Sequence, residues 1–395
     1  MGKQRKQKSK KPSRGKDAEQ KRFTATARRV ARGVELEQAF SFDESQLQNE
    51  EERRLSNDDM LSLVLHHMRV NGCDTPYAAA KLIEADTGIA PNPKAFYPVF
   101  CKALRERRIV YFAPRDRALE MRLHEKYSWL NRWRDNVYVA KTRVAHDVAH
   151  QAGHMLKEIV QSEFRGKEVH IGFAGGHTMR SVARTLAEML SALDANELPE
   201  KLVFYTMVAG FDVDDPVSDP VVFGTYFLDV PALRRVEFAV LRAPSTIRTA
   251  DYDKMRSLPE IEKAFTMARQ LNIVVTSGGC FGDEHSLFHS YMRRDEQSLR
   301  TLMQERCVGD MMWRPLGPHG PLDDRNLEIR AMTLKDPAEL PSFIASGQKV
   351  LLVLNPCRKC DTSKGAVLRS VLGYSAPHIT HLVVDHRTAA DAVSA

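Results

Sequence analysis

The sequence lacks any apolar run of the roughly 18 to 20 residues that a membrane-spanning helix needs, so we expect no membrane partner. Its first thirty residues also lack the apolar core of a secretory signal, and we expect a cytoplasmic protein. Cysteine is scarce, with 6 residues in a chain of 395. So few cysteines in so long a chain do not form a disulfide framework, and we expect reduced thiols.

The basic charge of the chain is confined to one end. Residues 1–33 hold thirteen Lys and Arg against two acidic residues, whereas the other 362 residues hold 45 against 49. The net charge of +7 is therefore a property of the tail and predicts nothing about the globular part. We expect residues 1–56 to be a disordered basic tail followed by an acidic linker. The tail suits either non-specific attraction to nucleic-acid phosphate or a solubilising or localisation role.

Residues 57–114 have the pattern of three short helices and a strand. Ser56 and Thr75 are good N-caps for the first two helices, the third is expected at 93–107, and a strand at 109–113. This order predicts a helix-turn-helix DNA-binding domain with a rudimentary wing. A small helical interaction or dimerisation module is the alternative. On the third helix the candidate DNA-binding side chains are Lys94, Lys102, Arg105 and Arg107.

Helical and strand patterns alternate through the rest of the chain. We expect a helical linker at 115–144 and an α/β domain at 145–395, with buried strands at 169–173, 201–210, 237–242, 273–276, 349–354 and 381–384. Such alternation implies a Rossmann-like fold, a mainly parallel sheet with helices on both faces. Ligands bind to these sheets beyond the carboxyl ends of the strands. The strand ends are therefore where we expect a site.

One strand end has the composition of an anion site. The strand at 169–173 runs into Gly175 and Gly176 and then into a helix that begins near Thr178. Glycines let backbone N–H groups approach a ligand, and a helix N-terminus carries about half a positive charge. The Thr178 hydroxyl and the Arg180 guanidinium add further donors. The pattern favours phosphate binding, although the same turn also forms for packing reasons alone.

A series of short motifs follows in a fixed order. These are Ile171-Gly-Phe-Ala-Gly-Gly-His-Thr178, Leu241-Arg-Ala-Pro-Ser245, Leu258-Pro-Glu-Ile261, Ile273-Val-Val-Thr-Ser-Gly-Gly279, Val308-Gly-Asp310, Asp323-Asp324-Arg325 and Lys364-Gly-Ala-Val-Leu368. Over roughly residues 60–395 the chain resembles the SorC family of bacterial transcription regulators. The resemblance implies a sugar-isomerase-like effector domain that binds a phosphorylated sugar. It also implies a homo-oligomer, a dimer or a tetramer, whose DNA binding the sugar alters.

The resemblance and the strand ends together give the candidate effector-binding residues. They are Gly175, Gly176, Thr178, Arg180, Arg242, Ser277, Gly278, Gly279, Asp324 and Lys364. For Lys364 the alternative is an ordinary solvated lysine at a helix start. For Asp324 and its neighbour Arg325 the alternative is ion pairing within a loop. The chain departs from the family pattern in its helical head, in its basic extension and at Cys357-Arg-Lys-Cys360, where the family has a plain glycine turn.

The Cys357-x-x-Cys360 pair has the spacing of half a zinc site. Partners for it would have to come from Cys280, Cys307, His285 or His319. Because a second pair at ligand spacing is missing, we expect neither a metal nor a cofactor.

Two other classes of function compete with a regulator. Gly282-Asp-Glu-His285 follows a glycine strand end, where sugar-phosphate isomerases and deaminases place acid/base residues for proton transfer. The helical head has no use in such an enzyme, and we therefore expect no enzyme. An RNA-associated or scaffolding protein that uses the basic tail is the third hypothesis.

Overall fold

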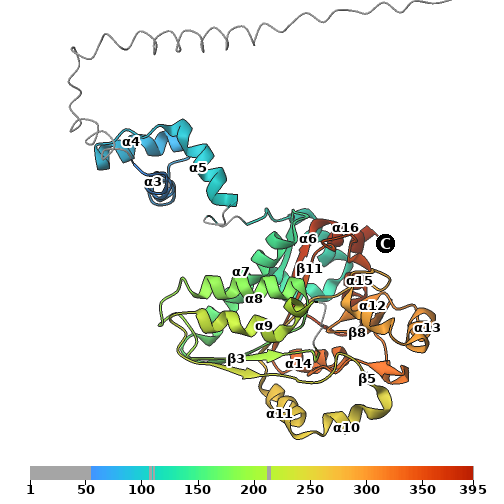
Figure 1. Cartoon of the computed structure of the whole chain (residues 1–395). Helices are drawn as coiled ribbons and strands as arrows, with labels where there is room; N and C mark the ends of the chain where they lie inside the picture. Colours follow the sequence, from blue (N-terminus) through green and yellow to red (C-terminus); the bar gives the residue numbers. More distant parts are fainter. Residues whose placement is uncertain (1–54, 106–108, 110–111, 211–214, 395) are drawn as a thin grey trace, which may run out of the picture. The chain divides into compact units, whose positions relative to one another are not determined.

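The computed structural model describes residues 55–105, 109, 112–210 and 215–394 (Figure 1). The chain divides after Val110 into two compact units. The expected basic tail and nearly all of the acidic linker lie outside the described residues. In the described part of the chain, no helix is both long and apolar enough to cross a membrane.

The first unit is helical, as the sequence predicts. It contains α3 (Asn57–Val70), α4 (Pro76–Thr87) and α5 (Pro93–Arg105). The Ser56 side chain accepts a hydrogen bond from the Asp59 N–H at 3.1 Å, which caps α3, and Thr75 caps α4 in the same way. The helices pack around one small core, formed by Met60, Leu61, Val64, Ala79, Ile83, Phe96, Val99 and Ala103.

The expected wing strand at 109–113 is not formed by the described residues of that segment. Residues 110–111 lie outside the described part, and the remainder adopts no strand. Phe112 instead packs edge-on against the His150 ring at a centroid distance of 4.8 Å, and Ala113 joins the core of the second unit. The described apolar residues of this segment therefore belong to two cores, because Ile109 packs on the core of the first unit.

The second unit is built on a seven-stranded parallel sheet, which confirms the predicted fold class. The strands lie in the order β1-β12-β11-β6-β2-β3-β4. Their bounds are β1 Val137–Ala140, β2 Glu168–Phe173, β3 Lys201–Thr206, β4 Val236–Ala239, β6 Ile273–Thr276, β11 Lys349–Leu354 and β12 His381–Asp385. The central strands are buried almost throughout, as expected for a parallel sheet covered on both faces.

Strand β1 lies where the sequence led us to expect a helical linker at 115–144. It pairs in parallel with β12, with Val137 opposite Leu382, and forms one edge of the sheet. The segment before it folds into α6 (Arg117–Lys126) and the 3-10 segment Ser128–Asn136. The linker residues are thus an integral part of the second unit. A four-residue strand at a sheet edge gives too short a pattern to detect from sequence.

Helices cover both faces of the sheet. On one face α7 (Ala145–Phe164), α8 (His177–Leu190) and α9 (Pro220–Thr225) lie side by side (Figure 1). On the other, α6 and α15 pack against the last helix of the chain. The remaining helices are α10 Tyr252–Arg256, α11 Pro259–Met267, α12 Leu287–Met292, α13 Glu296–Gln304, α14 Leu340–Ala345, α15 Gly365–Leu372 and α16 His386–Ser394. The helices divide between the two faces because right-handed crossovers that run in opposite directions along a sheet place their helices on opposite faces.

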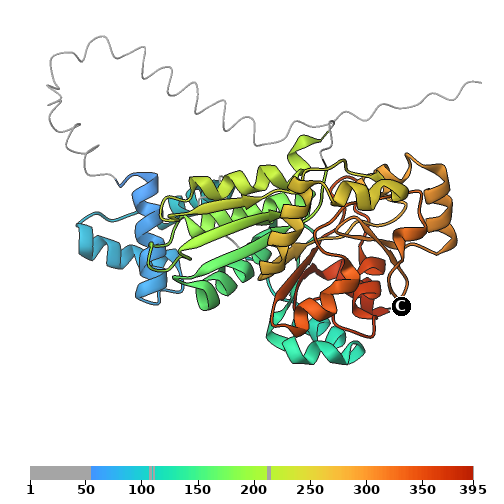
Figure 2. The same cartoon turned by 90° about the horizontal axis from the view of Figure 1, so that it is seen from below.

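Two small antiparallel sheets were not predicted. One consists of β7 (Gly309–Met311), β8 (Arg314–Gly317) and β9 (Gly320–Pro321), and it packs against α15 (Figure 2). The other pairs β5 (Ile247–Arg248) with β10 (Ile329–Arg330). Strands of two to four residues lack the alternation by which strands are recognised in a sequence.

The strand order defines a topological switch point. From β2 the chain continues to β3 and β4 on one side, whereas β6, β11 and β12 extend the sheet on the other. The crevice of such a sheet lies at the carboxyl ends of the two strands where the order reverses, here β2 and β6. The segments that follow these two strands are Gly175-Gly176 and Ser277-Gly278-Gly279.

Candidate functional site

Helix α8 begins at the switch point without a side-chain cap. Its N-cap is Gly176, with φ 104° and ψ 162°, and no side chain accepts a hydrogen bond from its first turn. The Gly176 N–H itself donates to the Ser218 carbonyl at 2.8 Å. Among the described residues, no hydrogen bond engages the N–H groups of residues 177–179. These three donors and the helix dipole make a ready site for an anion.

The two glycines before α8 are required for different reasons. A Cβ atom at Gly175 would lie 2.9 Å from the ring of Trp313, which covers this turn from the β7–β8 hairpin. At Gly176 there is open space, but the positive φ strains any residue with a side chain. Gly175 is thus required because a side chain would not fit against Trp313. Gly176 is required because its positive φ disfavours any residue that carries a Cβ atom.

Thr178 joins two strand ends. Its hydroxyl donates a hydrogen bond to Oδ1 of Asn355 at 2.8 Å, and the Asn355 amide donates to the Pro356 carbonyl. Asn355 directly follows β11 and is 3% exposed. We did not include it among the candidate site residues, although its place after a buried strand was a usable signal.

The end of β6 is held close to β7. A Cβ atom at Gly278 would lie 2.5 Å from the Asp310 carbonyl oxygen, and the Gly279 N–H donates to Asp310 Oδ1 at 2.9 Å. Both glycines thus allow a close approach of the backbone. Ser277 differs, because its Oγ is buried and has no hydrogen-bond partner among the described residues. A buried hydroxyl without a partner is costly, so Ser277 Oγ is suited to hydrogen-bond a ligand.

Lys364 immediately precedes α15 as its N-cap. Burial lowers the pKa of its ammonium group, and the nearby Cys280 and Asp310 act in the opposite direction. Burial also raises the pKa of Asp310, to about 6. Within the described part of the chain, no carboxylate lies within ion-pair distance of the Lys364 ammonium. A partly buried cation without a direct counter-ion is well suited to an anionic ligand, and it is not the solvated lysine of the alternative.

Among the described residues, the two predicted arginines make no hydrogen bond or ion pair with these groups. The Nε of Arg180 donates to the Tyr226 hydroxyl at 2.9 Å, which holds the guanidinium against the segment after α9. Arg242 is exposed and lies three residues beyond the observed end of β4. No interaction among the described residues brings either arginine against Thr178 or Lys364.

Asp324 takes part in a buried ion-pair network. Its carboxylate is 2% exposed and lies 2.8 Å from Arg314 and 3.1 Å from Arg330. The neighbouring Arg325 pairs with Asp323 at 2.7 Å and holds the pKa of that carboxyl at about 2. Both residues are thus ion-paired, but with other partners than each other.

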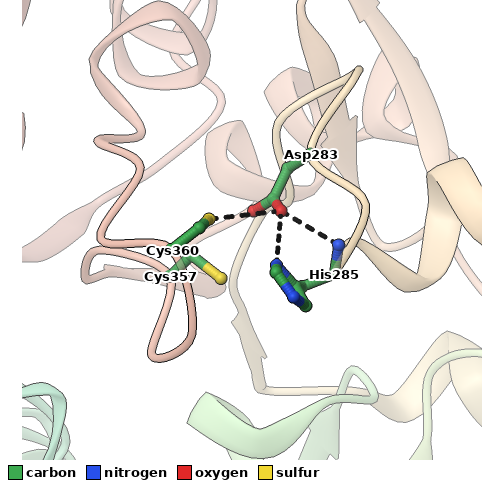
Figure 3. A group of neighbouring side chains, drawn as sticks. All are labelled: Asp283, His285, Cys357 and Cys360. Atoms are coloured by element: carbon green, nitrogen blue, oxygen red, sulfur yellow. Dashed lines mark hydrogen bonds and ion pairs between the residues drawn. The ribbon is translucent and has the colours of Figure 1, made fainter.

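The acid/base candidates Asp283 and His285 lie against the cysteine pair. Asp283 Oδ1 is 3.2 Å from Nδ1 of His285 and 3.5 Å from Sγ of Cys360, with Cys357 beside them (Figure 3). The other two cysteines that the sequence offered as partners, Cys280 and Cys307, are buried and are not among the four clustered ligand atoms, although Cys280 interacts electrostatically with Asp283 and Cys357. All six cysteines carry free thiols.

In the first unit, the predicted DNA-binding side chains are only partly described. Lys94 and Lys102 are exposed on α5. The side chain of Arg105 and the whole of Arg107 lie outside the described residues. Pro98 lies within α5, and Tyr97 beside it is 50% exposed.

The parallel sheet and its switch point define a ligand-binding domain of the Rossmann-like class. Residues 115–394 match the family described as Putative sugar-binding domain. The chain therefore belongs to this family, and the resemblance to the SorC family is confirmed. No characterised protein shows significant similarity to the chain by sequence alone.

Solved structures show the same fold. Full-length sorbitol operon regulator SorC from Klebsiella pneumoniae matches with a TM-score of 0.61 and 12% identity, over 86% of this chain and 100% of that one. A domain of a possible sugar-binding transcriptional regulator from Arthrobacter aurescens TC1 matches with 0.52 and 15%, over 70% and 97%. A transcriptional regulator from Streptococcus pneumoniae TIGR4 matches with 0.52 and 16%, over 69% and 94%.

Proposed function

We propose that this chain is a DNA-binding transcription regulator whose second unit binds a phosphorylated sugar. Membership of the sugar-binding domain family supports a sugar as the effector. The relatives of known structure are described as transcriptional regulators, which supports a regulatory rather than a catalytic role. The α/β unit is the sensor in this account, and the helical unit binds DNA.

One observation carries the proposal that the effector is phosphorylated. The uncapped N-terminus of α8 lies at the switch point, where it presents the free N–H groups of residues 177–179. A phosphate group accepts several hydrogen bonds at once and is attracted by the helix dipole. An unphosphorylated sugar would leave these donors without a charged acceptor.

The other groups at the strand ends have complementary roles. Gly176 sets the backbone conformation of the anion turn, and Thr178 orients Asn355 at the end of β11. Ser277 offers an unpaired hydroxyl, and Lys364 offers a positive charge. Asp324 stabilises the fold of the domain through its ion pairs with Arg314 and Arg330, and other residues bind the sugar hydroxyls. Arg180 and Arg242 act only if the ligand extends toward β3 and β4.

Regulation then follows from a difference in affinity. A sugar phosphate that binds one arrangement of the chain more tightly shifts the population toward it, and DNA binding changes by the same coupling free energy. We propose a cytoplasmic homo-oligomer, a dimer or a tetramer, because paired helical units match paired half-sites on DNA. Lys94 and Lys102, with the neighbouring arginines of the sequence, supply the phosphate contacts to DNA.

Footprinting of the full chain on the DNA upstream of its own gene tests this proposal. We expect a protected site whose affinity changes when one sugar phosphate is added, whereas the matching free sugar has no effect. Absence of protection under all conditions would contradict DNA binding. Turnover of a sugar phosphate by the purified chain would instead support the isomerase alternative.

A further inference from the structure

We propose that Asp283, His285, Cys357 and Cys360 form a binding site for one zinc ion. Each residue offers one ligand atom, and the four atoms all lie within 4.8 Å of one another (Figure 3). The four ligands are not among the groups to which we assign phosphate binding, although Lys364 interacts electrostatically with Cys357 and Asp283. It also differs from the expectation from sequence, in which the missing second cysteine pair argued against a metal.

The fold explains how two distant segments supply the four ligands. Strands β6 and β11 are parallel neighbours in the sheet, with Thr276 opposite Leu352. Their carboxyl ends therefore lie at the same edge, and the segment after β6 carries Asp283 and His285. The segment after β11 carries the two cysteines. The spacing of the first pair, Asp-x-His, is too common to be recognised in a sequence, and only the parallel pairing brings it to the cysteines.

The observed distances match the edges of a zinc tetrahedron. Zinc lies about 2.3 Å from sulfur and about 2.0 Å from nitrogen or oxygen, so tetrahedral angles give edges of roughly 3.5 Å between S and O and roughly 3.3 Å between N and O. The distance from Cys360 Sγ to Asp283 Oδ1 is 3.5 Å. The distance from His285 Nδ1 to the same oxygen is 3.2 Å. Two edges of the coordination polyhedron are thus present without rearrangement.

The cysteine turn is held in place from outside the cluster. The Cys357 N–H donates to the Thr362 carbonyl at 3.0 Å, and the Asp361 N–H donates to the Cys357 carbonyl at 2.9 Å. Asp361 has a positive φ of 56° and pairs with Arg387 of α16 at 2.6 Å. Arg358 donates to the Ser181 hydroxyl on α8 at 3.2 Å. These contacts fix the loop before any ion binds, which lowers the ordering cost of coordination.

The ligand set selects zinc among common divalent cations. Two thiolates with one imidazole and one carboxylate suit a borderline-soft, tetrahedral ion, whereas Mg²⁺ and Ca²⁺ prefer oxygen ligands in larger numbers. The Asp283 side chain is only 7% exposed and accepts a hydrogen bond from the His285 N–H at 2.9 Å, and a cation beside it would stabilise its charge further. With both cysteines ionised the site carries three negative charges against two on zinc. The nearby Lys364, which interacts electrostatically with Cys357 and Asp283, offsets the remainder.

Metal analysis of the purified full chain, kept in a reductant that does not bind metal, tests the proposal. We expect about one zinc per chain after incubation with Zn²⁺ and gel filtration. Cys360→Ser and Asp283→Asn should each lower this content at least tenfold. Cys101→Ser, at an exposed cysteine of the first unit, is the matched control and should retain the full content.

Cobalt provides a readout that does not depend on the variants. Co²⁺ bound to the wild-type chain should show the d–d and sulfur charge-transfer absorption of a tetrahedral site with two thiolates, and Zn²⁺ should displace it. A spectrum of octahedral, hydrated Co²⁺ would overturn the proposal. It would also be overturned by zinc below one tenth per chain after reconstitution, or by a Cys357–Cys360 disulfide that persists in reductant. Sugar binding plays no part in these measurements, so their failure leaves the proposed function intact.

Discussion

The hydroxyl of Thr178 donates a hydrogen bond to Oδ1 of Asn355, 2.8 Å away, across 177 positions of the chain. The bond links the start of α8, which follows β2, to the end of β11, with β6 between the two strands. It therefore fixes the uncapped helix terminus relative to the opposite side of the switch point. The phosphate site that we propose depends on this alignment.

Thr178→Glu should weaken sugar-phosphate binding at least tenfold, which corresponds to about 1.4 kcal/mol. The new carboxylate would occupy the first turn of α8, where it satisfies the N–H donors and repels a phosphate. Titration calorimetry with the effector measures the loss, and circular dichroism checks the fold. Arg184→Gln, at an exposed position of the same helix, is the control and should bind normally. Equal affinities for wild type and Thr178→Glu would remove Thr178 from the site.

Lys364→Met should lower the affinity for a sugar phosphate by about 10- to 100-fold, because a hydrogen bond to a charged group contributes about 1.5–3 kcal/mol. The matching free sugar should bind with unchanged affinity. Lys349→Met, at the opposite end of β11 and paired there with Glu163, is the control and should change neither. A parallel loss for both ligands would show that Lys364 acts on the pocket as a whole rather than on the phosphate.

Asp324→Asn should lower the free energy of unfolding by about 3 kcal/mol, since Arg330 loses the buried carboxylate it pairs with and Arg314 keeps only its pair with Asp336. Urea unfolding measures the change. Asp323→Asn, which breaks the exposed pair with Arg325, should cost less than about 1 kcal/mol. If Asp324→Asn kept full stability and lost sugar affinity instead, the carboxylate would belong to the effector site.

Acid should destabilise the second unit partly through His381. Burial, assisted by Lys349, lowers the pKa of this ring to about 4 from its usual 6.5. Since the folded pKa is the lower one, the neutral ring stabilises the fold above pH 6.5, and this contribution, about 3 kcal/mol, is lost as the pH falls toward 4. Between pH 7 and pH 4.5, His381→Gln should lose about 2 kcal/mol less than wild type in urea titrations. Identical losses would contradict the assignment.

The order of the long elements could be predicted from the sequence, and the short ones could not. The head helices α3 and α4 have capping residues, and α7 has apolar periodicity over twenty positions. Strands β6 and β11 are nearly continuous apolar runs. By contrast, β1 and the β7–β9 sheet have two to four residues each, and their formation depends on contacts with distant segments. The wing at 109–113 was expected from local apolarity, but Phe112 and Ala113 pack within the second unit instead.

Part of the candidate site could likewise be predicted from the sequence, and part could not. Glycines in the turn before α8 and after β6 indicate the backbone conformation of both segments, so both could be predicted from the sequence. One partner of Asp324 is Arg314, which lies ten residues away in a hairpin that was not predicted. No local feature of the sequence distinguishes such a buried ion pair from an exposed one. The approach of Asp283 and His285 to the cysteines likewise depends on the parallel pairing of β6 with β11.

Thermal unfolding of the full chain against a panel of sugar phosphates and their unphosphorylated counterparts tests the central claim most directly. Preferential binding to the folded state raises the midpoint by mass action. We expect at least one sugar phosphate to raise it by several degrees in wild type, with no rise from the matching free sugar and none in Thr178→Glu. An equal rise from the free sugar, or a full rise in Thr178→Glu, would contradict a phosphate site at the start of α8.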